Sequence, residues 1–200
     1  MSVKDMENQP MIAFVGGGNM AEAMLGGLYN SGYPKDHLGF SEPFNERRSY
    51  MTEKYPNVKS FSDSKQVVEG AQIIFFAVKP QIMPAVMGEL KEKLKENPHA
   101  LLISVAGGVT TDNIRRWLNA SSNVSLIRMM PNTPMLIGEG AVGLFATDTV
   151  DAKQRELTET ILRTVAKQLV WVKDESLLDT ITAVSGSGPA YYFLIMEAMR

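Results

Sequence analysis

The stretch Met11–Leu28 reads MIAFVGGGNMAEAMLGGL and places three adjacent glycines between an apolar run and an amphipathic run. The run Met11–Val15 is typical of a short, buried parallel strand. After the glycines, apolar side chains recur at Met20, Met24 and Leu28, a spacing that predicts one face of a helix. The sequence therefore predicts a strand, a glycine turn and a helix in direct succession.

The glycines belong to a G-x-G-x-x-[GA] pattern that spans residues 16–21. Gly16 would allow a tight turn, Gly18 would let a pyrophosphate approach the backbone, and Ala21 is small enough for the helix to pack close to the strand. The free amides at the helix N-terminus would then face the phosphates. A glycine turn without a ligand is the alternative, but the strand–turn–helix context favours dinucleotide binding.

The end of the second predicted strand bears on the choice of coenzyme. Glu42 follows Ser41 at about the spacing at which an acidic residue binds the ribose 2′-hydroxyl, which favours NAD. Arg47 and Arg48 lie one turn further on and could meet a 2′-phosphate. All three charges could equally be exposed surface charges, so these residues leave NAD and NADP open.

Strand and helix patterns alternate along most of the chain. Strands are predicted at 37–41, 57–61, 72–78, 100–105, 123–129 and 141–146, and helices through 47–51, after Pro80, at 110–118 and at 151–167. The apolar residues 170–172 close this part of the chain. This order predicts an α/β fold of the Rossmann type, with a doubly wound, mostly parallel sheet. We expect a flexible leader at 1–10 and a dinucleotide-binding domain at 11–174.

The last segment has a different pattern. Pro189–Met196 is apolar on every side of a helix, which is typical of a buried helix rather than one lying on a surface. We therefore expect an all-α C-terminal domain to begin within 175–200, near Leu177, and to be cut short at Arg200, or this helix to pack into a partner chain.

Three further turns follow predicted strands, at 77–80 (AVKP), 104–108 (SVAGG) and 130–134 (MPNTP). All would lie at the carboxyl ends of parallel strands, where open α/β sheets bind ligands. Ordinary turn chemistry of Gly and Pro is the alternative. Three such turns beside a dinucleotide pattern favour a cleft along a bound coenzyme.

Composition narrows the remaining possibilities. A net charge of -2 over 200 residues gives no reason to expect a nucleic-acid partner, and no apolar run reaches the ~20 residues that span a membrane. The chain has no cysteine, which fits a cytoplasmic location and excludes thiolate chemistry. His37 and His99 are predicted on the surface, so no metal site is expected. Ser185–Pro189 lacks a nucleophile elbow, which suits hydride transfer by a coenzyme.

Five segments together resemble the pyrroline-5-carboxylate reductase family, over about residues 11–199. They are FVGGGNMAEAMLGGL, IIFFAVKPQIM, LLISVAGGVT, IRMMPNTPMLIGEGA and AVSGSGPAYYFLIMEAM, in that order. The resemblance implies that NADPH or NADH reduces the ring imine of 1-pyrroline-5-carboxylate, the substrate, to L-proline. It also implies a homodimer or higher homo-oligomer built through C-terminal helices.

The resemblance also implies roles for particular residues. The pyrophosphate would lie against Val15, Gly16, Gly17, Gly18, Asn19 and Met20, and the adenosine side of the coenzyme against Ser41, Glu42, Ala77, Val78, Lys79 and Pro80. The nicotinamide end would lie against Val105, Ala106 and Gly107. Met130, Asn132 and Thr133 would border the substrate cleft. No catalytic residue is assigned, because the family's substrate loop would lie beyond Arg200.

One departure from the family pattern concerns the coenzyme. Glu42 stands where members that favour NADPH carry a serine, which makes use of NADH more plausible. Two other functions stay open: a different reductase related to the 3-hydroxyacid dehydrogenases, and a non-catalytic dinucleotide-binding protein if the natural chain ends at Arg200.

Overall fold

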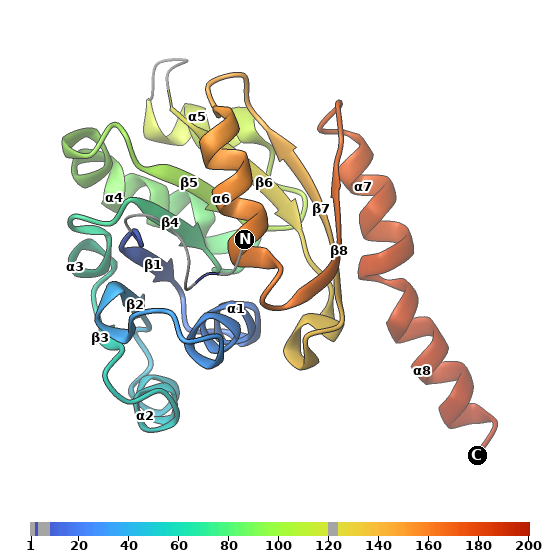
Figure 1. Ribbon diagram of the computed structural model, residues 1–200. Coiled ribbons are helices and arrows are strands. Elements are labelled where there is room, and N and C mark those ends of the chain that lie inside the picture. The colour runs from blue at the N-terminus through green and yellow to red at the C-terminus, as the bar shows by residue number, and fades with distance from the viewer. Residues whose placement is uncertain (1–2, 4–8, 120–123) are drawn as a thin grey trace.

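The computed structural model describes residues 3, 9–119 and 124–200 of the chain. In this part of the chain eight strands form one sheet in the order β3-β2-β1-β4-β5-β6-β7-β8, with helices on both faces (Figure 1). All neighbouring strands are parallel except β6 and β7. The predicted doubly wound, mostly parallel sheet is therefore confirmed.

The elements follow the predicted alternation closely. In chain order they are β1 (Ile12–Val15), α1 (Asn19–Asn30), η2 (Lys35–His37), β2 (Leu38–Ser41), α2 (Asn45–Lys54), β3 (Lys59–Phe61), α3 (Ser64–Val68), β4 (Ile73–Phe76), η3 (Pro80–Ile82), α4 (Met83–Glu96), β5 (Leu101–Ser104), α5 (Thr111–Leu118), β6 (Leu126–Met130), η4 (Thr133–Ile137), β7 (Gly140–Ala146), α6 (Ala152–Leu162), β8 (Ala166–Trp171), α7 (Leu177–Ile181), the π-helical turn η5 (Thr182–Gly186) and α8 (Gly188–Ala198). Helix α3 was not predicted; it is one short turn capped by Asp63, whose side chain accepts from the amide of Lys65.

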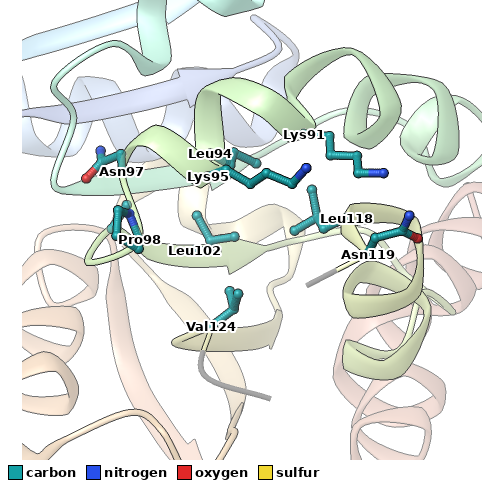
Figure 2. A pocket seen from close by; sticks show the side chains of 10 residues that line it. Lys91, Leu94, Lys95, Asn97, Pro98, Leu102, Leu118, Asn119 and Val124 are labelled. Atoms are coloured by element: carbon teal, nitrogen blue, oxygen red, sulfur yellow. The ribbon is translucent and has the colours of Figure 1, made fainter. Parts of the chain in front are cut away.

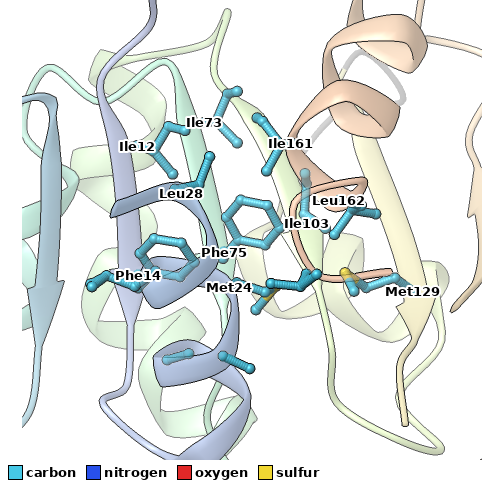
Figure 3. Packing of buried hydrophobic residues seen from close by; sticks show 14 of the residues in the cluster. Ile12, Phe14, Met24, Leu28, Ile73, Phe75, Ile103, Met129, Ile161 and Leu162 are labelled. Carbon is cyan, nitrogen blue, oxygen red and sulfur yellow. The ribbon is translucent and has the colours of Figure 1, made fainter. Parts of the chain in front are cut away.

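The central strands bury side chains on both faces of the sheet. In β4, Ile73 and Phe75 join the apolar cluster under α1 and α6, whereas Ile74 and Phe76 join the cluster under α3, α4 and α5. Phe14 of β1 stacks on Phe75 with ring centroids 5.0 Å apart, in the first of these clusters (Figure 3). This two-sided burial is the reason why the strand sequences are continuously apolar rather than alternating.

Helix α6 is shorter than the sequence predicts. The prediction of a helix over 151–167 was wrong at its C-terminal end, because α6 ends at Leu162 and β8 begins at Ala166. Val165 continues the helical spacing of apolar residues but lies in the turn between them, buried against Gly27 of α1. Its burial comes from this tertiary contact, which the spacing of residues in the sequence does not distinguish from a helical position.

The C-terminal segment leaves the sheet. Leu178 of α7 is fully buried, and Ile181 packs against Gly143 of β7, but α8 projects away from the body of the chain (Figure 1). Tyr192 is 70% exposed and Leu194 is 65% exposed. The described chain does not bury this helix, and the expectation that the rest of a helical domain or a partner chain covers it stays a prediction.

Two sets of predictions fall partly on residues outside the described part. Most of the expected leader, residues 1–2 and 4–8, lies there, whereas Val3 is buried and its carbonyl accepts from the Gln9 side chain at 3.1 Å. Residue 123, the expected start of the sixth strand, also lies outside. Among the helices that the structure describes, none combines the length and the apolar character needed to cross a membrane.

Candidate functional site

The carboxyl ends of β1, β4, β5 and β6 lie side by side, because these strands are parallel neighbours in the sheet. The glycine turn and the turns at 77–80, 104–108 and 130–134 therefore emerge at one edge. The prediction that they share one edge of the sheet is confirmed. This is the edge at which open α/β sheets bind ligands.

Gly16 makes the tight turn that the sequence predicts. Its φ is +101°, and a Cβ atom there would lie 2.7 Å from the carbonyl oxygen of Ala77. The amide of Ala77 donates to the carbonyl of Val15 at 2.9 Å, so the turn is pressed against the end of β4, beside Val78. Both the backbone conformation and the contact require glycine.

Gly18 differs from Gly16 in both respects. Its φ is -70°, which any residue adopts, and a Cβ atom there would meet nothing within 4 Å. The first helical hydrogen bond of α1 runs from the amide of Glu22 to the carbonyl of Gly18 at 2.9 Å, so the amides of residues 19–21 precede the helical series. Glycine is not needed for this chain's own packing here, and the open space in front of free amides fits the pyrophosphate of a dinucleotide.

Glu42 lies at the glycine turn, as its position after β2 predicts. Its side chain is buried, and Oε2 accepts from the amide of Gly17 at 3.1 Å while Oε1 accepts from the amide of Phe44 at 3.0 Å. Ser41 instead directs its hydroxyl to Oγ of Ser64, 3.0 Å away, and reaches the turn through its carbonyl, which accepts from Gly16 at 3.0 Å. A carboxylate therefore lies directly beside the glycine turn.

The two arginines of α2 have partners within the chain. Arg47 donates from Nε to the carbonyl of Gly17 at 2.7 Å and from Nη2 to Glu22. Arg48 donates to the carbonyl of Glu42 at 2.7 Å and to Oδ1 of Asn45 at 2.9 Å. From the sequence, each arginine was interpreted either as a ligand of a 2′-phosphate or as a surface charge. The sequence did not predict that Arg47 and Glu22 form a contact.

Glu22 also forms an ion pair with a second cation, Lys54, whose Nζ donates to Oε1 at 2.7 Å. Burial alone would raise the pKa of the Glu22 carboxyl, but the hydrogen bonds and charges of Lys54 and Arg47 outweigh it and hold that pKa below its ordinary value. The hydrogen bond to Glu22 is the main reason why the pKa of Lys54 is raised. Glu22 is therefore an ionised, paired carboxylate in the first turn of α1.

The turn after β5 is built mainly from backbone contacts. The amide of Val105 donates to the carbonyl of Phe76 at 3.1 Å, and that of Ala106 donates to the Ser104 hydroxyl at 3.3 Å. Ala106 is buried, whereas Val105 and Gly107 are partly exposed at the sheet edge. Lys79 is exposed at the neighbouring turn, where its backbone caps η3 before Pro80.

The turn after β6 uses its side chains differently. Asn132 is buried, and its Oδ1 accepts from the amide of Ala141 at 3.0 Å, so it holds the start of β7. Thr133 is exposed, and Met130 is partly buried under the π-helical turn. A Cβ atom on Gly186 would lie 2.9 Å from Cε of Met130. The structure thus brings the glycine–serine segment 185–188, which precedes α8, against the turn at 130–134.

A second ion-pair network joins α7 to the sheet. Arg128 of β6, whose side chain is 4% exposed, donates to Glu175 at 3.2 Å and to Asp179 at 3.1 Å. Glu175 also accepts from the amide and hydroxyl of Thr111, at 2.8 and 2.7 Å, at the start of α5. Sequence reasoning missed this network because its members lie far apart in the chain and belong to no motif.

Other features do not contribute to this edge. A cavity of about 370 Å³ lies between α4 and α5 near the amino ends of β5 and β6, where Leu94, Leu102 and Leu118 line it (Figure 2). Nδ1 of the partly buried His37 lies 2.7 Å from the carbonyl of Gln9, and His99 is exposed. Within the described ranges, no three His, Asp or Glu side chains are grouped as metal ligands.

The fold and the glycine turn define a class, the oxidoreductases with a nucleotide-binding domain of this type. Residues 11–108 match the family model described as NADP oxidoreductase, coenzyme F420-dependent. Residues 175–200 match the model described as pyrroline-5-carboxylate reductase dimerisation. The first match covers β1 to β5 with the glycine turn, and the second covers the C-terminal helical segment.

Curated relatives narrow the class to one family. The pyrroline-5-carboxylate reductase of Pseudomonas aeruginosa is 40% identical over 190 residues, which cover 95% of this chain and 67% of that protein. The enzyme of the same name from Pasteurella multocida is 39% identical, over 94% of this chain and 68% of that protein. The chain belongs to the pyrroline-5-carboxylate reductase family.

Solved structures agree with this assignment. A pyrroline-5-carboxylate reductase from Coxiella burnetii superposes with a TM-score of 0.87 at 41% identity, over 94% of this chain and 68% of that one. A pyrroline carboxylate reductase from Plasmodium falciparum, solved with NADP bound, gives 0.82 at 27% identity, over 96% of this chain and 68% of that one.

Proposed function

We propose that this protein reduces 1-pyrroline-5-carboxylate to L-proline with a reduced nicotinamide coenzyme. The observation that carries the proposal is the open space at Gly18, in front of the first amides of α1, at the same sheet edge as the turn that contains Met130. A chain of this family with such an edge can hold a dinucleotide beside a small substrate.

The residues of the chain would bind and orient rather than react. When bound, a reduced coenzyme supplies a hydride to the imine carbon, and with a proton on the ring nitrogen the C=N bond becomes CH–NH. The backbone of residues 15–20 would hold the pyrophosphate. The turns at 77–80 and 105–107 would border the adenosine and nicotinamide parts, and Met130 and Thr133 would border the substrate. Asn132 would act by holding β7 in place.

We also propose that NADH is preferred over NADPH. Glu42 supports this, because its carboxylate lies at the adenosine side and is fixed by the amides of Gly17 and Phe44. A carboxylate there accepts hydrogen bonds from a ribose diol and repels a 2′-phosphate. Replacement by serine, Glu42→Ser, is expected to raise the affinity for NADPH relative to NADH by about tenfold, as measured by titration with each coenzyme. An unchanged ratio of the two affinities would contradict the proposal.

We further propose that residues 11–174 form the nucleotide-binding domain and that 175–200 belong to a helical dimerisation domain. The exposed apolar side chains of α8 support this proposal, because a second copy of the chain would cover them. A homodimer or larger homo-oligomer follows from such a contact. The lack of cysteine supports a cytoplasmic location.

The test separates coenzyme binding from turnover. Binding of NADH and NADPH is measured first, by the coenzyme-induced rise in melting temperature. Proline formation from 1-pyrroline-5-carboxylate is then followed together with coenzyme oxidation. We expect both, with one proline formed for each coenzyme oxidised. Binding without turnover by the purified protein would contradict the reductase proposal and favour a dinucleotide-binding protein. Absence of binding would contradict the site itself.

A further inference from the structure

The N–H and the carbonyl of Gly17 both form hydrogen bonds with side chains of the segment that follows β2. Its N–H donates to Glu42 Oε2 at 3.1 Å, and its carbonyl accepts from Arg47 Nε at 2.7 Å. Gly17 lies between the tight turn at Gly16 and the open position at Gly18. The residue at the centre of the phosphate-binding turn is therefore fixed by two oppositely charged side chains.

The Arg47 contact sets the direction of the next amide. The carbonyl of Gly17 and the N–H of Gly18 share one peptide plane, and none of the described peptide bonds is cis. In a trans peptide these two groups point in opposite directions. By holding the carbonyl on the α2 side, Arg47 aims the N–H of Gly18 away from α2.

The Arg47 guanidinium is also fixed by neighbours other than Gly17. Nη2 donates to Glu22, and the guanidinium lies over the ring of Tyr50 at 5.0 Å from its centroid. Its side chain is 28% exposed. Two of its five N–H donors are thus committed within the chain, and the contact with the ring of Tyr50 fixes the guanidinium beside the turn.

The Glu22 contact has an electrostatic consequence. Glu22 lies in the first turn of α1, close to the amides that would face the pyrophosphate. An unpaired carboxylate at that place opposes the binding of an anion, and Arg47 and Lys54 neutralise it. Arg47 therefore acts on the turn through both geometry and charge.

We propose that Arg47 is a positioning residue of the phosphate-binding turn, which supports NADH and NADPH equally, and that it does not read the 2′-phosphate. The inference rests on the proposed function only in requiring that the chain binds a dinucleotide. It assigns Arg47, and with it Glu22, a role in binding the part that the two coenzymes have in common.

The experiment compares Arg47→Ala with Arg48→Ala, its matched control on the same helix, in the whole protein. Affinities for NADH and NADPH are measured by fluorescence titration, and unfolding is measured without coenzyme. We expect Arg47→Ala to weaken both coenzymes by about tenfold with their ratio unchanged, and to raise the coenzyme KM more than it lowers kcat. Arg48→Ala removes hydrogen bonds to the backbone carbonyl of Glu42 and to Asn45, but none to Gly17 or Glu22. It is expected to leave both affinities within about twofold, because the Glu42 carboxylate is still held by the amides of Gly17 and Phe44.

A second variant separates geometry from charge and controls for folding. Adding Glu22→Gln to Arg47→Ala removes the unpaired carboxylate and is expected to recover part of the lost affinity for both coenzymes, most at low salt. A loss confined to NADPH would overturn the proposal in favour of 2′-phosphate contact. Unchanged affinities in Arg47→Ala would overturn it as well. If the unaltered protein bound neither coenzyme, the proposed function would fail instead.

Discussion

The glycine turn after β1 and the helix α8 differ in how much of their environment this chain supplies. At the turn, Gly16 contacts the end of β4, and Gly17 is held by Glu42 and Arg47. In α8, large apolar side chains such as Phe193 are 64% exposed within the described chain. The described chain supplies the contacts of the first region and leaves the apolar side chains of the second exposed.

We therefore expect the two regions to depend on different contacts. The turn is expected to bind coenzyme through contacts made by the described chain, whereas α8 is expected to gain its packing from association. The Arg128 network links the sheet to the segment that leads to α8, because it joins β6 to Glu175 and to Asp179 of α7. Substitutions at the turn, at the link and in α8 should therefore have separable effects.

The largest effect is expected at Gly18. Gly18→Asp places a carboxylate in the space for the pyrophosphate and is expected to weaken coenzyme binding by about a thousandfold or more. The melting temperature without coenzyme should stay unchanged, because the position is open and its φ suits any residue. Gly18→Ala, the matched neutral variant, should show a smaller loss of affinity. Unaltered coenzyme affinity in Gly18→Asp would remove the turn from the site.

The next effect is on stability and comes from Gly16. Gly16→Ala puts a Cβ 2.7 Å from the Ala77 carbonyl at a φ of +101°. We expect the free energy of unfolding to fall by about 3 kcal/mol, measured by chemical denaturation. A result equal to that of Gly18→Ala would mean that the two glycines do not have the different roles described above.

Breaking the Arg128 network is expected to lower the free energy of unfolding by less than Gly16→Ala does. Arg128→Met leaves Glu175 without its buried cation, and we expect a loss of about 2 kcal/mol in the free energy of unfolding. The value is modest because Glu175 keeps Thr111 and because Asp179 is 70% exposed. Coenzyme affinity should change by less than about twofold, since Arg128 does not contact the glycine turn. A large loss of affinity would show that the turn is not independent of the link.

A smaller, pH-dependent effect is expected at Glu22. Its folded-state pKa lies below the ordinary value of 4.5, so the stability that it contributes is present above that value and is lost as the pH falls through the folded pKa. Glu22→Gln should lower the free energy of unfolding at neutral pH by about 1 kcal/mol and flatten its acid limb. Denaturation curves at several pH values check this. An unchanged acid limb would contradict the pairing with Arg47 and Lys54.

The smallest effect on the nucleotide site is expected from α8. Leu194→Glu should weaken self-association, measured by sedimentation, and leave the affinity for coenzyme within about twofold. Glu197→Gln, on the same exposed helix, is the control for a change of charge without a change in the apolar surface. If Leu194→Glu abolished coenzyme binding while association persisted, the proposed separation of the two regions would be wrong.

The fold was predictable from sequence wherever periodicity and burial agree. The strand, glycine turn and helix at 11–30, and the four turns at one sheet edge, follow from local patterns. The end of α6 at Leu162 was not predictable, because Val165 is buried by contact with α1 while keeping the helical spacing. The environment of α8 was not predictable either, since an apolar pattern does not say which molecule provides the cover.

Within the site too, the sequence predicts positions that follow from local spacing but not contacts that depend on tertiary packing. The position of Glu42 followed from its distance along the chain from the glycines, and its carboxylate lies at the turn. Arg47 was weighed only as a phosphate ligand or a surface charge, because its partners, Gly17 and Glu22, precede it by 30 and 25 residues. Contacts over such separations depend on how α1 and α2 pack together, which no local motif encodes.

Met130, at the end of β6, contacts Gly186 in the π-helical turn that precedes α8. Helix α8 has 11 residues and begins just after this contact, so it extends about 16 Å as an arm. The far end of a methionine side chain adapts to small shifts of a neighbour. A rotation of about 10° at this contact moves the tip of the arm by about 3 Å. A molecule that covers α8 would therefore lie within about 16 Å of the turn after β6.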